Sequence, residues 1–194
     1  MKIIDKIKRG NYLSIEIEPP KIGSGLKNIF SVLDPLVDLG IKHIDITYHP
    51  EQIIGHIKQN GDTFPLSQKK KPGTAGIAGA IIGRYKDKDI EPVPHMICTG
   101  FTKYHTEEYL TELAFLGVEN VLALRGDPPK GPDRKFIPFK PMPGGHSHAN
   151  ELIEQITGLK ESKYVGAKYG EPLDFCAGAA CYPEKHSQSK SLDN

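Results

Sequence analysis

Two glutamates near the start of the chain are the first residues whose types and spacing could do chemistry. Glu16 and Glu18 lie in the alternating segment 12–18 (YLSIEIE), so they share one face of a predicted strand while the apolar side chains share the other. A carboxyl group held between apolar neighbours and beside a like charge keeps its proton to higher pH. We therefore predict a raised pKa for Glu16, as a general acid needs, against the alternative that both glutamates are solvated.

Polar side chains also follow the other predicted strands, each at its carboxyl end. They are Thr47, Tyr48 and His49, then residues 95–99, then Arg125, Gly126 and Asp127, and finally Tyr182, Pro183, Glu184 and His186. Ligand sites of parallel α/β proteins form from the loops at that edge. The sequence therefore predicts one ligand site at the carboxyl ends of the strands.

Several histidines raise the question of a metal site. His146 and His148 follow a Gly-Gly pair, and His49, His95 or His186 could supply further ligands. Two histidines at this spacing in a loop, without cysteines or carboxylates at ligand spacing, match no known ligand set. We therefore predict no bound metal.

The elements that must position these residues alternate between two periodicities. Period-2 or continuous apolar runs predict strands at 12–18, 42–48, 93–98, 120–124 and 175–181. Helical stripes predict helices at 26–39, 74–85, 106–116 and 149–159, with Thr74 and Thr106 as N-caps, a kink or break at Pro35, and a possible fifth helix from His186 onward. A long polar loop is predicted between residues 48 and 74.

This alternation predicts an α/β fold with a parallel sheet and right-handed crossovers. A doubly wound sheet would carry a glycine-rich phosphate turn after its first strand, where this chain has Glu18, Pro19 and Pro20, and segment 73–84 (GTAGIAGAIIGR) does not match G-x-G-x-x-G. A closed barrel fits better, although eight units typically need about 250 residues. We predict a (β/α)8 TIM-barrel type fold, truncated after about four and a half units, with residues 1–194 as a single partial barrel domain.

Composition and charge limit the partners. The chain has 194 residues, 38% of them hydrophobic, and a formal net charge of +1, so no overall field recruits nucleic acid or an anionic membrane. Three cysteines without a C-x-x-C pair, and a charged N-terminus unlike a signal peptide, favour a soluble cytoplasmic protein. An incomplete barrel would leave strand 175–181 as an unpaired edge, so we expect a homo-oligomer.

Five segments together resemble the methylenetetrahydrofolate reductase family, FAD-dependent TIM barrels of one-carbon metabolism and methionine biosynthesis. They are 14–20 (SIEIEPP), 46–48 (ITY), 94–95 (PH), 123–129 (ALRGDPP) and 179–186 (AACYPEKH). The resemblance implies an oxidoreductase that uses NAD(P)H and FAD to reduce 5,10-methylenetetrahydrofolate to 5-methyltetrahydrofolate. It further implies that Glu16 is the acid that protonates the folate, and that Asp127 tunes the flavin and stabilises the cationic substrate.

The resemblance also implies a set of FAD-binding residues. They are Thr47, Tyr48, His95, Arg125, Gly126, Asp127, Ala149, Tyr182 and His186. Arg125 offers a forked donor for phosphate or the flavin edge, and the two tyrosines offer stacking surface.

The chain departs from the family pattern at three places. Glu18 stands where the family usually has an apolar residue, His49 and Pro50 stand where it often has Gly-Ala, and the family continues well beyond Asn194. The choice between NADH and NADPH, and the activity of this chain by itself, are therefore open. So is the role of Lys69–Lys71, either a solvated loop or a contact for a polyglutamate tail or phosphate.

Two rival functions also stay open at this point. One is a truncated, non-catalytic partial barrel that binds a flavin or pterin. The other is a metal-dependent barrel hydrolase.

Overall fold

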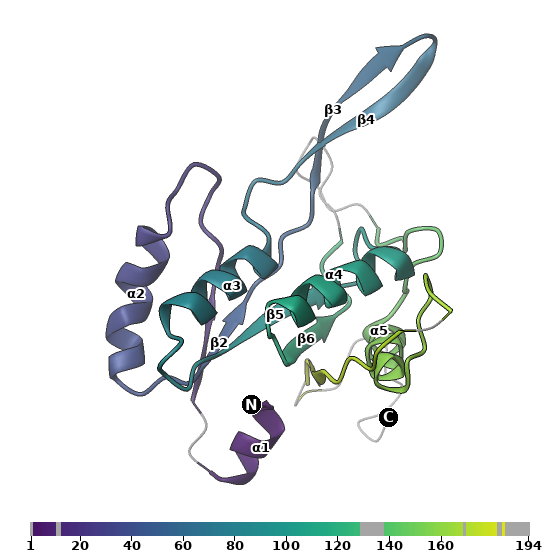
Figure 1. The fold of residues 1–194 in the computed structure, drawn as a ribbon. Coiled ribbons are helices and arrows are strands. Elements are labelled where there is room, and N and C mark those ends of the chain that lie inside the picture. Colours follow the sequence, from purple (N-terminus) through teal and green to yellow (C-terminus); the bar gives the residue numbers. More distant parts are fainter. Residues whose placement is uncertain (1, 11–12, 129–137, 169, 182–183, 185–194) are drawn as a thin grey trace.

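Five strands form one parallel sheet in the order β1-β2-β5-β6-β7 (Figure 1). In this computed structural model, which describes residues 2–10, 13–128, 138–168, 170–181 and 184, every neighbouring pair in that sheet runs parallel. The strands are β1 (Ser14–Ile17), β2 (His43–Ile46), β5 (Glu91–Ile97), β6 (Asn120–Leu124) and β7 (Cys176–Ala179). The predicted α/β class, the parallel sheet and its five strands are confirmed.

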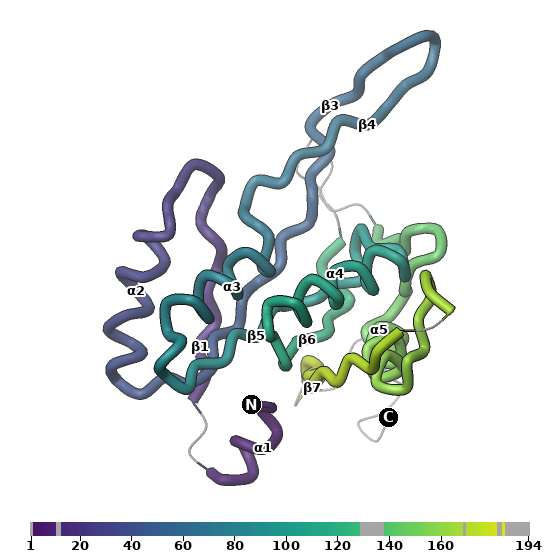
Figure 2. The backbone as a smooth tube through the Cα atoms, viewed as in Figure 1, coloured from purple at the N-terminus to yellow at the C-terminus, as the bar shows by residue number. Residues whose placement is uncertain are grey.

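Helices between the strands cover one face of the sheet (Figure 2). They are α2 (Lys27–Asp38), α3 (Thr74–Arg84), α4 (Lys103–Phe115) and α5 (Ala149–Gly158), the last followed by the short 3-10 turn η1 (Leu159–Glu161). No helix in the described residues is long and apolar enough to span a bilayer.

The core lies between those helices and the apolar face of the strands. Ile44 and Ile46 of β2 are fully buried there, together with Leu33 of α2, Ile81 of α3 and Leu110 of α4. Because strand side chains alternate between faces, His43 and Asp45 of β2 point to the opposite face of the sheet. That opposite face is therefore the polar one.

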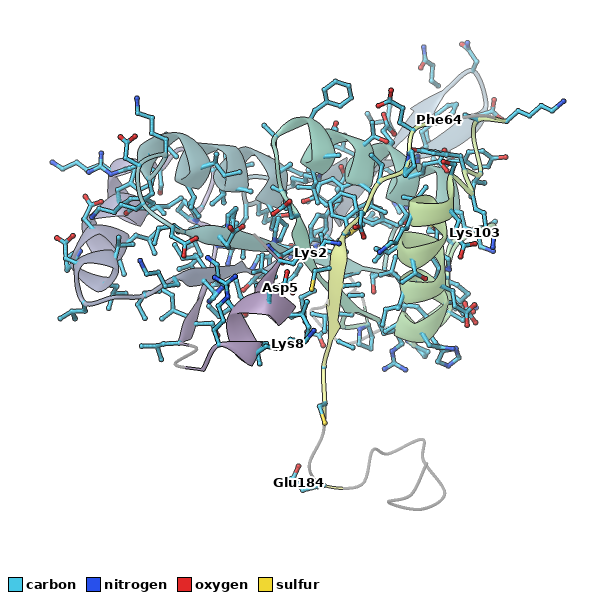
Figure 3. All side chains as sticks on the ribbon, turned by 60° about the horizontal axis from the view of Figure 1, so that its bottom comes forward. Lys2, Asp5, Lys8, Phe64, Lys103 and Glu184 are labelled. Carbon is cyan, nitrogen blue, oxygen red and sulfur yellow. The ribbon has the colours of Figure 1, made fainter. Side chains whose placement is uncertain are left out.

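A short helix, α1 (Ile3–Lys8), lies on the polar side of the sheet, away from α3 and α4 (Figure 3). The amide of Ile3 donates to Asn120 Oδ1 at 2.8 Å, and Lys6 Nζ lies 2.6 Å from Asp89 Oδ1, just before β5. These bonds place α1 at the amino ends of β5 and β6. The sequence analysis missed it because six residues with no buried side chain give no periodicity to detect.

The prediction of a polar loop after β2 is wrong for most of that segment. Residues Gln52–Gln59 (β3) and Asp62–Gln68 (β4) pair as an antiparallel hairpin that projects from the molecule. Asn60 and Gly61 at its tip have φ of 52° and 89°. An Asn-Gly pair with two positive φ angles is the preferred two-residue hairpin turn, and this signal was present in the sequence.

Three details of the predicted helices also need correction. Thr102, not Thr106, caps α4, since its hydroxyl accepts from the His105 amide at 3.1 Å. Gly73 precedes α3 as its N-cap, and the Thr74 hydroxyl instead contacts the Tyr109 hydroxyl. The break predicted at Pro35 does not occur, because α2 continues through it with Leu33 and Val37 buried on either side.

Candidate active site

Four polar side chains lie on the polar face of β1, β2 and β5, near the carboxyl ends of these strands. Glu16 on β1 pairs in register with Asp45 on β2, and Thr47 follows two residues later on the same face. His95 on β5 lies on this face too, because its neighbour Pro94 is opposite Ile46. The parallel sheet thus brings together Glu16, Thr47 and His95, which the sequence predicted from separate segments.

A direct hydrogen bond joins the first two strands at this point. The Thr47 hydroxyl lies 2.6 Å from Glu16 Oε1 and the Thr47 amide donates to the Ile17 carbonyl at 3.1 Å. The backbone bond fixes where the threonine stands, and the hydroxyl then orients the Glu16 carboxyl. Glu16 itself is exposed to solvent.

Asp45 is the member of this group that the sequence analysis missed. Burial, and the charge of Glu16 beside it, raise the pKa of Asp45 to about 6. His95 Nε2 lies 3.9 Å from Asp45 Oδ1. Burial lowers the pKa of His95, whose side chain is only 5% exposed, so the imidazole is neutral at pH 7 and does not cancel the negative charge.

Glu18 is not part of β1, the strand in which the prediction placed it with Glu16. It lies just beyond the end of β1, where it is paired with Lys71, and its Oε1 lies 3.4 Å from His49 Nε2. The hydrogen bond and charge of Lys71 lower the pKa of Glu18. The carboxyl group that faces Glu16 is therefore Asp45.

The base of the hairpin meets the same edge of the sheet. Lys71 Nζ lies 3.2 Å from His49 Nε2, and Lys69 Nζ lies 5.9 Å from the ring centroid of Tyr48. The Lys71 side chain is only 18% exposed. The expectation of a solvated lysine loop is thus wrong for Lys71.

Tyr48 is held in a cluster of rings. Its ring packs edge-on against Phe101 and Tyr109, with centroids 5.3 and 6.1 Å away, and burial raises the pKa of its hydroxyl well above the ordinary value. These contacts tie the loop after β2 to α4 and to the segment just before it. Stacking of Tyr48 on a flavin stays a prediction.

The loop after β6 is bound tightly to the end of β5. The amides of Cys98 and Thr99 both donate to the Arg125 carbonyl, at 3.1 and 3.2 Å. Gly126 has a φ of +84°, and a Cβ there would stand 2.7 Å from Thr99 Oγ1. Glycine is therefore required at this turn, which aligns Arg125 and Asp127 on its two sides.

Arg125 and Asp127 reach the carboxyl edge of the sheet from a different strand than Glu16. The Arg125 guanidinium lies 5.3 Å from the centroid of the Phe139 ring, and Asp127 is exposed. In the strand order, β2 and β5 separate Asp127 from Glu16. Both carboxylates thus belong to one edge of the sheet, and no contact between them is seen.

The remaining predicted site residues fall toward the end of the chain. Ala149 is the first residue of α5. Tyr182 and His186 lie outside the described residues. Glu184, also singled out in the sequence, is exposed and lies far from the sheet in Figure 3.

The His146 and His148 pair is divided between two structural roles. His146 is buried and its Nε2 lies 2.6 Å from Gln155 Oε1, while His148 is exposed beside Glu151. Across the part of the chain that the structure describes, no three His, Cys, Asp or Glu side chains come together as a metal site would require.

Comparison with known proteins identifies the family. A family model described as "Methylenetetrahydrofolate reductase" matches residues 2–194. The chain belongs to the methylenetetrahydrofolate reductase family. The resemblance carried by the five sequence segments is therefore confirmed.

Curated relatives agree with this assignment. The chain is 31% identical over 192 residues to both "Probable methylenetetrahydrofolate reductase (NADH)" of Oryza sativa subsp. japonica and "Methylenetetrahydrofolate reductase (NADH) 1" of Arabidopsis thaliana. Each alignment covers 96% of this chain and 26% of the relative. "Probable methylenetetrahydrofolate reductase (NADPH)" of Caenorhabditis elegans is 25% identical over 190 residues, which cover 98% of this chain and 24% of that protein. The chain thus spans about a quarter of the length of these methylenetetrahydrofolate reductases.

Asp45 could have been found in the sequence. In the segment His43–Ile46 (HIDI), the polar residues alternate with isoleucines that the helices must cover. A largely buried aspartate on a strand inside a sheet is rare unless it is paired with a cation or has a function. That pattern was the available signal.

Proposed function

We propose that this chain carries the flavin site and the acid group of a reductase that converts 5,10-methylenetetrahydrofolate to 5-methyltetrahydrofolate with NADH or NADPH. The observation that carries the proposal is the hydrogen-bonded pair of Glu16 and Thr47, with His95 on the same polar face, in a chain of this family. We further propose that the five-stranded sheet represents the first strands of a (β/α)8 barrel, whose interior is this polar face.

The residues present suit a flavin. His95 is buried, and its Nε2 has no hydrogen-bond partner among the described residues, so it is available to a ligand. Leu122 and Leu124 of β6 share its face of the sheet, are half-buried, and offer an apolar surface for a flat ring. Thr47, His95, Gly126 and Asp127 would hold FAD at this edge, and Arg125 would meet its diphosphate or its ring edge.

When bound, FAD supplies hydride transfer, and the chain supplies binding, orientation and protons. Opening of the folate's five-membered ring to an iminium cation requires a proton at its nitrogen leaving group. In the proposal Glu16 donates that proton from its carboxyl, held in place by the Thr47 hydroxyl. Asp127 then stabilises the positive charge of the iminium by its own negative charge.

The two half-reactions test this proposal separately. Purified chain is titrated with FAD, reduced anaerobically with NADH or NADPH, and then mixed with methylenetetrahydrofolate while flavin absorbance is followed. We expect bleaching by the nicotinamide and recovery on adding the folate. A chain that binds no FAD, or whose reduced flavin is not reoxidised by the folate, would leave a non-catalytic barrel as the better description.

Glu16→Gln tests the acid. We expect the folate half-reaction to slow by roughly 10²- to 10⁴-fold, because the amide cannot give up a proton, while reduction of the flavin is spared. Glu18→Gln is the matched control, since the Glu18 carboxylate is paired with Lys71 beyond the end of the strand. Equal loss of both half-reactions in Glu16→Gln would remove the assignment.

A further inference from the structure

Asp45 lies at the centre of the polar face, and the proposed mechanism leaves it unused. It is flanked in register by Glu16 on β1 and by Val93 on β5. On its own strand, His43 precedes it and Thr47 follows it on the same face. Among titratable groups, Glu16, His43 and His95 therefore surround it.

The residues that the structure describes place no cation beside Asp45. Its side chain is only 20% exposed, and its one ionic contact among the described residues is His95, at 3.9 Å. Burial lowers the pKa of both His95 and His43, so both are neutral near pH 7. Lys6 lies at the amino ends of the strands, beside Asp89 and Glu91.

Two carboxylates facing each other across neighbouring strands repel, and the repulsion is mutual. Since no cation stands beside Asp45 among the described residues, each negative charge makes the other carboxyl harder to ionise. The raised pKa of Asp45, which burial and Glu16 cause, agrees with such a pair. The Thr47 hydroxyl contacts Glu16 and not Asp45, so the environments of the two carboxyls differ.

We propose that Asp45 is a positioning residue for Glu16: the two carboxyls are coupled, and the negative charge of Asp45 disfavours ionisation of Glu16, so that a larger share of Glu16 carries a proton for the folate. The role of Asp45 in catalysis rests on the proposed function. The existence of the coupled pair does not depend on that function. Asp45 gives no proton to the substrate in this scheme. After Glu16 donates its proton, both carboxylates are charged, and Glu16 takes up a new proton from solvent.

A carboxyl titration tests the pair without any activity. Side-chain carboxyl carbons are labelled with ¹³C, and the Asp45 signal is followed against pH by NMR in the full chain, assigned by its loss in Asp45→Asn. We expect Asp45 to titrate near pH 6, and Glu16→Gln to lower its midpoint by about one unit, the size of an interaction between neighbouring carboxyls. Glu18→Gln, the control, leaves the midpoint in place. A midpoint near the ordinary aspartate value, or one that Glu16→Gln does not move, would overturn the proposal.

The pH profile of the folate half-reaction tests the use of the pair. In Asp45→Asn we expect reduction of the flavin by the nicotinamide to be unchanged and its reoxidation by the folate to be several-fold slower at neutral pH, with recovery toward acid pH. Equal profiles in the two proteins would refute the positioning role. If the wild-type chain shows no folate half-reaction, the proposed function fails, and the carboxyl titration still decides whether the pair exists.

Discussion

Gly126, in the loop after β6, packs closely against the end of β5. Gly126→Ala would put a Cβ 2.7 Å from Thr99 Oγ1 and 3.0 Å from Ile97 Cβ, in a backbone conformation with φ of +84°. We expect the free energy of unfolding to fall by roughly 2–4 kcal/mol, from left-handed backbone strain and overpacking together. Chemical denaturation measures this loss.

Gly100→Ala is the control for Gly126. Gly100 has a nearly equal φ of +80°, but no atom lies within 4 Å of a Cβ built there. It therefore bears only the backbone strain, about 1–2 kcal/mol. Equal losses in the two variants would show that the contact with β5 does not decide the residue type at position 126.

At the scale of elements, the β3–β4 hairpin is attached to the molecule mainly through its base. Isolated two-stranded hairpins are marginally stable in water, and the side chains of this one are largely exposed. The side chain of Lys71, paired with Glu18 and near His49, ties this base to the end of β1. The hairpin therefore depends on a few contacts at one end.

Lys71→Ala should loosen that attachment. We expect faster proteolysis and faster amide hydrogen exchange within residues 52–68, with little change in the strands of the main sheet. Lys70→Ala is the control, because Lys70 contributes its backbone carbonyl to the Ile22 amide and is exposed. Identical hairpin exchange in both variants would contradict a role for the Lys71 ion pair.

At the scale of the whole molecule, Asp45 makes folding stability depend on pH in an unusual direction. Its pKa is about 6 in the folded chain, against about 3.9 for an unfolded aspartate. A group that holds its proton more tightly when folded costs stability as pH rises, here between about pH 4 and pH 6. Buried His43, with its pKa lowered to about 4, acts the opposite way, since stability falls as pH drops below about 6.5.

A difference measurement separates these two groups. Asp45→Asn should be more stable than the wild type at pH 7, by up to about 3 kcal/mol, and the difference should vanish near pH 4. His43 is present in both proteins and cancels in the comparison. Thermal or urea unfolding of both proteins across this range is the measurement, and a difference that does not vary with pH would rule out the raised pKa.

Strong local patterns made most of the fold predictable. The segment 120–124 forms β6 within the predicted bounds. A short apolar run between polar residues favours a buried strand, because it is too short for a buried helix. Helix ends were less certain, and Thr102 and Thr106 show why. Either threonine has the side chain of a cap, and only the burial of Thr106 inside α4 decides between them.

The sequence by itself determined the parallel α/β sheet, the family, and the edge at which the polar residues gather, because periodicity and motifs are local properties of the chain. Only the tertiary structure decided which charged side chains are neighbours in space. Glu18, two residues from Glu16 in sequence, is drawn away to Lys71, while Asp45, twenty-nine residues distant, is placed opposite Glu16 by strand register. Coulomb energy depends on distance in space and on burial, and neither is encoded in the spacing along the chain.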